Sequence, residues 1–368
     1  MTTMVKIPWW EPQLAGGELS RVTQVLDSNF LNDGDVTTAF EQRIAALFGA
    51  SHAVATTSGT TAIFLAVGAA GAGPGDEVIV PDVTFIATAN AVRLTGATPV
   101  LVDIDPATLN IDVEQVRQAI TPYTKAIVPV HVSGRGADMD ALMALGREHG
   151  VAVIEDAAEA LLSRSRGRQL GTIGQAGCLS FSPNKTITTG QGGIVLTNDD
   201  AFAARLRALK DHGRPVRGTG GNDMHPTLGY NFKLTNLQAA VGLAQAELLE
   251  PRVAKLRQIY RGYRDGLKGI AQITLPGFDV DGGEVPQWVD AVAERRDALV
   301  AYLLDHNMHC RPFWYPIHTQ QPYRRPDAQF PQSTRLMEQA VWLPSALSLS
   351  DADVAAVCDA IRRFYAKG

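Results

Sequence analysis

Two kinds of hydrophobic pattern alternate between residues 76 and 154, and this alternation restricts the possible fold more than any other feature. Short apolar runs, which are typical of buried strands, occur at 78–80, 99–102, 126–132 and 151–154. Segments with helical spacing lie between them, at 84–94, 113–120 and 139–148. Because strands joined through helices pair in parallel, the pattern predicts an α/β fold with a mostly parallel sheet covered by helices on both faces.

The rest of the chain extends this pattern and adds a second unit. Further strands are expected at 176–181 and 193–196, and further helices at 18–26, 37–48, 62–68, 200–210, 291–307 and 351–365. A long helical stretch at 235–264, with a break at Pro251, marks the passage between the units. Since 368 residues suit about two domains, we expect a large domain at 1–245 and a smaller one at 246–368.

Composition excludes several classes of function. A net charge of −5 offers no basic excess to meet nucleic-acid phosphates or an anionic membrane surface. The three cysteines are widely spaced, and no metal-ligand spacing is found. Residues 1–10 lack the apolar core of a signal peptide, and no apolar run has the length of a membrane span. We therefore expect a cytoplasmic protein without nucleic-acid, membrane or metal partners.

One lysine lies among hydroxyls and glycines, directly after the apolar run at 176–181. It is Lys185, within Ser180-Phe-Ser-Pro-Asn-Lys-Thr-Ile-Thr-Thr-Gly-Gln-Gly-Gly193. A lysine amine in such a place can form a Schiff base with an aldehyde, and it becomes nucleophilic when desolvated. The aldehyde cofactor that uses a lysine in this way is pyridoxal phosphate, which also needs a carboxylate at its pyridine nitrogen and a phosphate site.

Candidates for both requirements are present, each with a simpler alternative. Asp156 directly follows the strand at 151–154, where ligands of parallel sheets bind, but it could equally be a helix N-cap. The turn Thr57-Ser-Gly-Thr-Thr-Ala62 leads into a helix and suits a phosphate, although a Ser/Thr cap without a ligand has the same pattern. Phe85 could stack on a flat ring or could be a core residue.

Together these features resemble the PLP-dependent sugar aminotransferase family, also called the DegT/DnrJ/StrS family. The similarity spans residues 8–365. It is densest in Thr57-Ser-Gly-Thr-Thr-Ala62, Asp82-Val-Thr-Phe-Ile-Ala-Thr88, Pro129-Val-His131, Glu155-Asp-Ala-Ala-Glu159, Ser180-Phe-Ser-Pro-Asn-Lys185, Thr188-Thr-Gly-Gln-Gly-Gly193, Gly229-Tyr-Asn231 and Arg311-Pro-Phe-Trp-Tyr-Pro-Ile-His318. The resemblance implies an aspartate-aminotransferase-like fold (type I of the PLP enzymes), with a smaller α+β C-terminal domain.

The resemblance also implies roles for particular residues. Lys185 matches the Schiff-base lysine, Asp156 the partner of the pyridine nitrogen, and Glu159 the position near the ring hydroxyl. Phe85 matches the aromatic residue that stacks on the ring. Phosphate contacts are implied for Thr60, Thr61 and Ser180, and also for Asn231, which the family supplies from the partner subunit. A homodimer with active sites at its interface is therefore implied.

The implied reaction moves an amino group from L-glutamate to a keto-sugar in a ping-pong sequence. Glu159, the Thr-Ile-Thr-Thr-Gly after the lysine, and Arg311-Pro-Phe are frequent among perosamine-synthase-like members, so a nucleotide-linked 4-keto-6-deoxyhexose is favoured. An eight-carbon acid sugar or an aminocyclitol precursor stays open. Candidates for substrate contacts are Arg311, Trp314, Tyr315 and His318, with ordinary packing as their alternative. The stretch Pro286-Gln-Trp288 departs from the family's usual aromatic strand.

Three other functions fit these residues less well than amino transfer. A dehydratase of the same fold carries His at the lysine position in the resembling family, so Lys185 favours amino transfer. A regulatory or sugar-binding relative without chemistry would be expected to lose one of Lys185, Asp156 or the Thr60–Thr61 pair. A nicotinamide dehydrogenase is disfavoured because Gly71-Ala-Gly-Pro-Gly75 lacks a glycine at the required offset.

Overall fold

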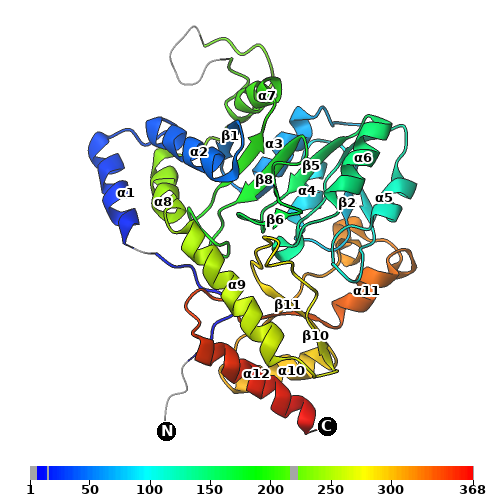
Figure 1. Cartoon of the computed structure of the whole chain (residues 1–368). Coiled ribbons are helices and arrows are strands. Elements are labelled where there is room, and N and C mark those ends of the chain that lie inside the picture. Colours follow the sequence, from blue (N-terminus) through cyan, green and yellow to red (C-terminus); the bar gives the residue numbers. More distant parts are fainter. Residues whose placement is uncertain (1–5, 15, 216–222, 368) are drawn as a thin grey trace.

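The computed structural model describes residues 6–14, 16–215 and 223–367 (Figure 1). Its larger sheet has seven strands in the order β1-β9-β8-β5-β4-β2-β3. Their bounds are β1 (His52–Thr56), β9 (Gly193–Thr197), β8 (Ala176–Ser180), β5 (Ala152–Asp156), β4 (Thr124–Ile127), β2 (Glu77–Pro81) and β3 (Thr98–Val102). Only β9 runs against its neighbours, β1 and β8. The predicted mostly parallel sheet is thus confirmed.

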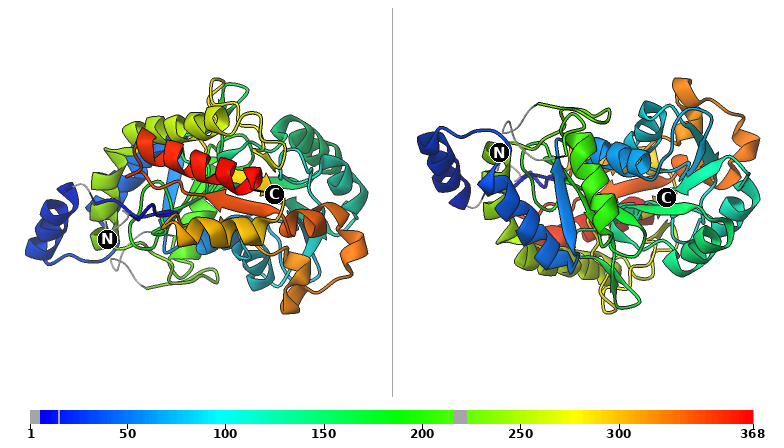
Figure 2. Two further views of the ribbon diagram at one scale, coloured as in Figure 1. Left: turned by 90° about the horizontal axis from the view of Figure 1, so that it is seen from below. Right: turned by 90° about the horizontal axis from the view of Figure 1, so that it is seen from above.

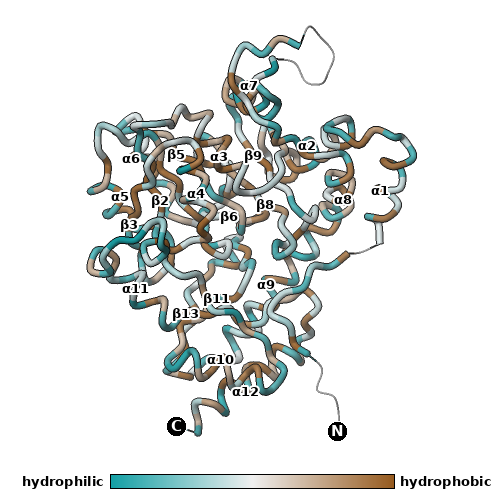
Figure 3. Tube along the Cα trace, turned by 180° about the vertical axis from the view of Figure 1, so that it is seen from behind, coloured by the Kyte–Doolittle hydropathy of each residue, from teal (hydrophilic) through white to brown (hydrophobic). Residues whose placement is uncertain are grey.

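Helices cover both faces of this sheet. One layer consists of α3 (Gly59–Ala69), α4 (Ala87–Leu94) and α7 (Asp200–Lys210). The other consists of α2 (Asp35–Phe48), α5 (Val113–Ala119), α6 (Met139–His149) and α8 (Asn236–Ala246). Helix α3 is apolar on nearly every side because it is enclosed by the sheet and by its neighbouring helices. Hydrophobic stretches run through α3 and the central strands (Figure 3).

A second, smaller sheet is antiparallel, with the order β10 (Ile273–Thr274), β11 (Val289–Ala293), β13 (Ala340–Leu343) and β12 (Arg311–Pro312). Side chains of β13 alternate between its two faces. Val341 and Leu343 pack with helices α9 (Leu249–Gly266), α10 (Arg296–Asp305) and α12 (Asp351–Ala366). Trp342 packs on the other face, against residues of the larger sheet's loops. The predicted fold class is therefore confirmed in both parts.

We call the two parts the large unit (the seven-stranded sheet with α1 to α8) and the small unit (the four-stranded sheet with α9 to α12). Helix α1 (Gly17–Ser28) packs on α8 at the periphery of the molecule, as both views of Figure 2 show. A hairpin of β6 (Arg164–Ser165) and β7 (Arg168–Gln169) and helix α11 (Pro331–Met337) complete the fold. We propose a domain boundary at 245/246, next to the end of α8.

Three expected elements differ from the structure. The strand expected at 126–132 ends at 127, because Pro129 has no N–H for the ladder. The helix expected at 291–307 begins as strand β11, and Arg295, with a left-handed φ of 52°, separates this strand from α10. The break in 235–264 lies between Ala246 and Leu249, so Pro251 falls in the first turn of α9, where a missing N–H is tolerated.

Among the described residues, no helix combines the length and the apolar character that a membrane crossing requires. Within that same part of the chain, no group of three His, Cys, Asp or Glu side chains is placed to hold a metal ion.

Candidate active site

A cavity of about 320 Å³ opens where strands β5 and β8 end, and residues from both units line it. It brings together most of the residues singled out from the sequence, namely Thr60, Phe85, Asp156, Glu159, Ser180, Lys185, Arg311 and Trp314. The motifs that supply these side chains are up to about 250 positions apart in the chain, so the fold gathers them at the carboxyl edge of the sheet, as expected for an α/β protein.

Lys185 and Glu159 form an ion pair inside this cavity. The Nζ of Lys185 donates to Oε1 of Glu159 at 3.1 Å, and both side chains are buried. The second carboxylate oxygen of Glu159 accepts the backbone N–H of Ser133 at 2.9 Å. Burial raises the pKa of Glu159, while the Lys185 cation and the Ser133 N–H oppose that rise. The amine is thus held at a fixed place next to a group that can exchange a proton with it.

Asp156 is the last residue of β5, and its side chain is buried beside the cavity. Oδ2 accepts from the hydroxyl of Thr88 at 2.8 Å, and Oδ1 accepts from the N–H of Ala158 at 3.2 Å. Burial raises the pKa of this carboxyl, and the hydrogen bond from Thr88 acts against it. No helix starts after Asp156, since turns follow it, so the helix-cap alternative is wrong.

The N-terminus of α3 forms the polar end of the cavity. The side chain of Thr61 closes a capping box with Ser58, accepting the Ser58 N–H at 2.9 Å and donating to the Ser58 carbonyl at 2.8 Å. Thr61 is therefore occupied by the cap and lies outside the cavity lining. Among the described residues, no partner accepts from the N–H groups of Gly59 and Thr60, so this end offers free donors and the positive end of the helix dipole.

Gly59 lets α3 begin directly against the end of β8. A Cβ at this position would lie 2.8 Å from Cβ of Ser180, which is too close for any other residue without a shift. The hydroxyl of Ser180 thus stands beside the free N–H groups. An anion with several oxygens suits this donor set.

Phe85 lies in the loop before α4, which begins at Ala87 and not at the expected residue 84. Its side chain is 54% exposed and lines the cavity, so the alternative of a core phenylalanine is wrong. A half-exposed aromatic face inside a cavity suits a flat, ring-shaped ligand.

Besides Thr61, three further candidate residues do not line the cavity. Tyr315 is 65% exposed and does not line it. His318 is fully buried, and its Nδ1 lies 2.6 Å from Oδ2 of Asp82, so ordinary packing explains it and the expected substrate contact is corrected. Asn231 is exposed and forms an isolated bridge with Asp211. Its contact with a partner subunit's phosphate site stays a prediction.

Trp288 and Trp314 line the cavity as its tryptophan floor, and they belong to a tryptophan cluster of which only Trp314 was a candidate site residue from the sequence. All five tryptophans of the chain, Trp9, Trp10, Trp288, Trp314 and Trp342, belong to it or pack against it. The guanidinium of Arg311 lies 4.9 Å from the ring centre of Trp9 and 5.5 Å from that of Trp342. Among the described residues, no carboxylate forms an ion pair with Arg311, so this cation is available to a ligand.

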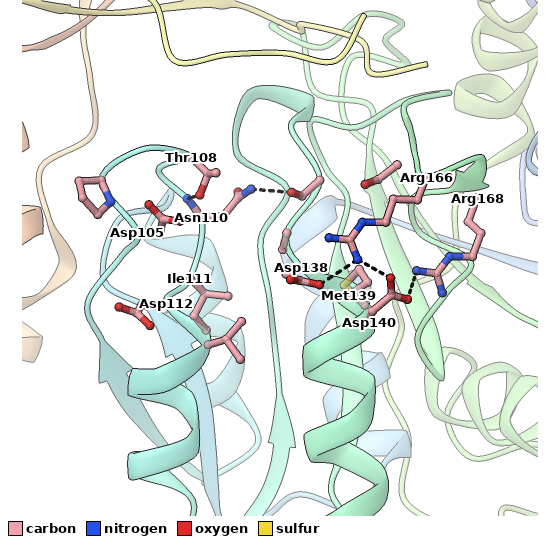
Figure 4. A pocket seen from close by; sticks show the side chains of 15 residues that line it. Asp105, Thr108, Asn110, Ile111, Asp112, Asp138, Met139, Asp140, Arg166 and Arg168 are labelled. Atoms are coloured by element: carbon pink, nitrogen blue, oxygen red, sulfur yellow. Dashed lines mark hydrogen bonds and ion pairs between the residues drawn. The ribbon is translucent and has the colours of Figure 1, made fainter. Parts of the chain in front are cut away.

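A larger groove of about 540 Å³ lies elsewhere, along the start of α6 and the β6–β7 hairpin (Figure 4). Its arginines already pair with carboxylates, and the carboxylates of Asp105 and Asp112 accept backbone N–H groups. Arg166 and Arg168 reach toward Asp140, and Arg166 also contacts Asp138, which caps α6. These side chains are largely exposed to solvent. Among the described residues that line the groove, every ionisable side chain is at least partly exposed and already has a bonding partner, and we assign the functional site to the smaller cavity.

Comparisons with known proteins agree with this assignment. The profile of the DegT/DnrJ/EryC1/StrS aminotransferase family matches residues 12–362. GDP-perosamine synthases of Caulobacter vibrioides and of Escherichia coli O157:H7 are each 37% identical to the chain, over 98% of it and 99% of their own length.

Solved structures give the same result. The structure of 3-amino-5-hydroxybenzoic acid synthase superimposes with a TM-score of 0.92 at 30% identity, over 99% of this chain and all of the other. DesV of S. venezuelae, in complex with a ketimine intermediate, gives 0.90 at 35% identity, over 95% and 94%. On the evidence of motifs, fold and site, the chain belongs to the DegT/DnrJ/EryC1/StrS aminotransferase family.

Proposed function

We propose that this protein is a PLP-dependent sugar aminotransferase that moves an amino group from L-glutamate to a nucleotide-linked 4-keto-6-deoxyhexose, as a GDP-perosamine synthase does. The observation that carries the proposal is the pairing of Lys185 with Glu159 in the same cavity as buried Asp156 and the free N-terminus of α3.

The residues present fit pyridoxal phosphate. The free N–H groups of Gly59 and Thr60, with the hydroxyls of Thr60 and Ser180, would hold its phosphate. Asp156 would hold the pyridine nitrogen in its protonated form, and Phe85 would stack on the ring. When bound, the cofactor supplies an electron sink for the charge that develops at the substrate carbon.

Lys185 is the group that moves the proton in this proposal. Its amine would take a proton from Cα of the amino donor and deliver it again on the cofactor side, which is general acid–base catalysis by a group already in reach. Glu159, 3.1 Å away, would accept or return a proton at Lys185 Nζ as the amine changes its charge. The tryptophan floor keeps bulk water away from this exchange.

The choice of sugar rests on the relatives. Two GDP-perosamine synthases match over nearly the whole chain at 37% identity, which favours a GDP-linked 4-keto-6-deoxyhexose. Arg311 and Trp314 line the cavity and are the candidates for substrate contacts. The alternative acceptor is another keto-sugar, such as an eight-carbon acid sugar or an aminocyclitol precursor. A structural relative named for an aminobenzoic acid product is in line with a wider range of acceptors.

Three further points belong to the proposal. We propose a homodimer, in which Asn231 would reach the phosphate site of the partner subunit. We also propose that the protein works in the cytoplasm. L-glutamate as the amino donor rests on the family resemblance.

The test is a visible spectrum of the purified protein with pyridoxal phosphate, before and after L-glutamate. We expect a Lys185-dependent band that glutamate converts to the spectrum of pyridoxamine phosphate, and no such band in Lys185→Ala. A panel of GDP-, dTDP- and UDP-linked 4-keto-sugars then identifies the acceptor. A protein without any Lys185-dependent band would contradict the proposal and favour a non-catalytic relative.

A further inference from the structure

We propose that a segment of the small unit, residues 287–290, positions Lys185 and Glu159 for reaction. We call it the positioning segment; it leads from the preceding loop into β11. The two members of the Lys185–Glu159 pair come from different loops of the large unit, after β8 and after β5. The positioning segment fastens both. Its meaning for catalysis rests on the proposed function, whereas its effect on the lysine amine does not.

Gln287 holds the chain on both sides of Lys185. This side chain is fully buried. Its Oε1 accepts from the N–H of Thr186 at 3.1 Å and from the hydroxyl of Thr186 at 2.6 Å, and its Nε2 donates to the carbonyl of Asn184 at 3.4 Å. Because these partners immediately flank Lys185, Gln287 fixes the point from which the lysine side chain extends.

Asp290 holds the other member of the pair through Ser133. Oδ1 of Asp290 accepts the hydroxyl of Ser133 at 2.6 Å, and Oδ2 pairs with Arg135 at 2.9 Å. The backbone N–H of Ser133 donates in turn to Glu159 at 2.9 Å. Asp290 thereby acts on Glu159 through Ser133, and Asp290 itself does not line the cavity.

Ser133 joins the two halves of the arrangement. Its carbonyl accepts the N–H of Gln287 at 2.8 Å, so all three of its polar groups are bonded to the positioning segment or to Glu159. Ser133 has a φ of 53°, in the left-handed region that residues other than glycine rarely adopt. Such a conformation persists only where the surroundings determine it, and the three hydrogen bonds supply that determination.

Trp288 lies between Gln287 and Asp290 and completes the contact with the lysine. Its ring centre is 4.9 Å from Lys185 Nζ, within the range of a cation–π interaction. The ammonium group is thus placed by a carboxylate on one side and an aromatic face on another. Other charged groups that line the cavity are Asp156 and Arg311.

The experiment uses the full chain loaded with pyridoxal phosphate and follows the pH midpoint of its Lys185-dependent absorbance. Gln287→Met keeps the volume and removes the hydrogen bonds, and Asp290→Asn removes the charge. We expect each variant to shift the midpoint by about 0.5 to 1 pH unit. The loss or weakening of one hydrogen bond that places the pair changes the free energy of the charged form by an amount that corresponds to such a shift.

Matched controls come from residues of the same kind elsewhere. Gln169 is a buried glutamine bonded to Ser163, and Asp103 is a buried carboxylate that accepts the hydroxyl of Ser333 at 2.6 Å. Neither lines the cavity. We expect Gln169→Met and Asp103→Asn to leave the midpoint unchanged, even where they lower the unfolding temperature. Equal shifts in the controls would overturn the inference, because they would show a general loss of stability.

A second measurement needs no cofactor. Competitive acetylation of the cofactor-free chain across pH, read by mass spectrometry, reports how readily Lys185 reacts compared with the other lysines. We expect the profile of Lys185 alone to move to lower pH in Gln287→Met and Asp290→Asn, since its cation loses a well-placed partner. An unchanged profile in folded variants would overturn the inference.

If Asp290→Asn fails to fold because Arg135 loses its partner, Ser133→Gly tests the same link. It removes the hydroxyl, tolerates the left-handed backbone and leaves the Arg135–Asp290 pair in place. The same shift is expected, and its absence would again count against the inference. Failure of the proposed function would look different, because the wild-type chain itself would then lack the Lys185-dependent band.

Discussion

The cavity and the larger groove contain the same kinds of charged group in opposite circumstances. In the groove, Asp140 pairs with Arg166 and Arg168 in contact with solvent. In the cavity, Glu159 and Lys185 pair out of solvent, while Asp156 is buried and Arg311 has no carboxylate partner among the described residues. Solvated, mutually satisfied charges contribute little to stability or chemistry, whereas buried groups with spare bonding capacity are available to a ligand. Cavity size alone is therefore a poor guide to the site.

The strongest way to break this comparison is to remove a cation from each place. Lys185→Ala should lower amino transfer by at least about a thousandfold, because it removes both the attachment point and the proton carrier. Arg166→Ala in the groove should leave the rate within about twofold, since an exposed ion pair is worth little. The measurement is the formation of 2-oxoglutarate from L-glutamate in the presence of the acceptor sugar. Comparable losses in both variants would abolish the distinction.

Replacing a carboxylate in each place should give a smaller difference. Asp156→Asn should lower the rate by about a hundredfold or more, because the group that would keep the pyridine nitrogen protonated is lost. Its unfolding midpoint in urea should not fall, since Asn can still accept from Thr88. Asp140→Asn serves as the matched variant in the groove. If Asp156→Asn unfolds the protein instead of slowing it, the carboxylate has a structural role.

The aromatic wall of the cavity should affect cofactor affinity and little else. Phe85→Ala should weaken binding of pyridoxal phosphate by about five- to tenfold, the equivalent of about 1 kcal/mol of stacking. Because Phe85 is 54% exposed, its removal should leave the unfolding temperature nearly unchanged. Tyr123, an exposed aromatic residue outside both depressions, is the control. Fluorescence titration with the cofactor measures both affinities. If Phe85→Ala and Tyr123→Ala weakened binding equally, stacking at Phe85 would be contradicted.

The smallest effect is a difference in the sign of pH dependence. Burial raises the pKa of Asp156 in the folded protein, so its contribution to stability is complete below the unfolded value of about 3.9 and is lost as pH rises through the raised value. The hydrogen bond from Arg166 lowers the pKa of Asp140, so its contribution is present above the unfolded value and is lost as pH falls through the lowered value.

Urea unfolding of the cofactor-free protein between about pH 2.5 and 8 checks this contrast, because this range includes the lowered pKa of Asp140 as well as the raised pKa of Asp156. Relative to wild type, Asp156→Asn should become more stable as pH rises, because the buried charge is absent. Asp140→Asn should change in the other direction and by less, since Asp140 is exposed. Parallel trends in the two variants would show that burial does not separate the two places.

The sequence was sufficient for the side chains that sit in contiguous motifs. Lys185 and Asp156 were found because each follows an apolar strand, and the strand ends converge in any parallel sheet, whereas Glu159 was implied by the family resemblance. Thr60 and Thr61 could not be told apart, since the capping box that occupies Thr61 and leaves Thr60 free depends on the first turn of α3. Similarly, the partner of His318 is Asp82, which is 236 positions away.

The small unit was harder to predict for a physical reason. Residues 291–307 form one apolar and charged run that suits a helix, and pairing with β10 and β13 makes its first part a strand. Pairing between distant strands leaves little local signal. Gln287 and Trp288 were therefore noticed only as part of a departure from the family pattern, although they contact the loop of Lys185 from about 100 positions away. Asp290, which binds Ser133, was not singled out at all.

The segment that precedes α1 has a consequence for the order of synthesis. Ile7 bridges to Met308, the carbonyl of Trp9 accepts the N–H of Ser345, and the indole of Trp10 donates to Pro183 in the loop before Lys185. Residues 7–10 thus leave the ribosome well before their partners at positions 308 and 345 and have to wait for them. A nascent chain can complete the seven-stranded sheet once β9 has been made, yet its lysine loop lacks the hydrogen bonds of Gln287 until residue 287 has been made as well.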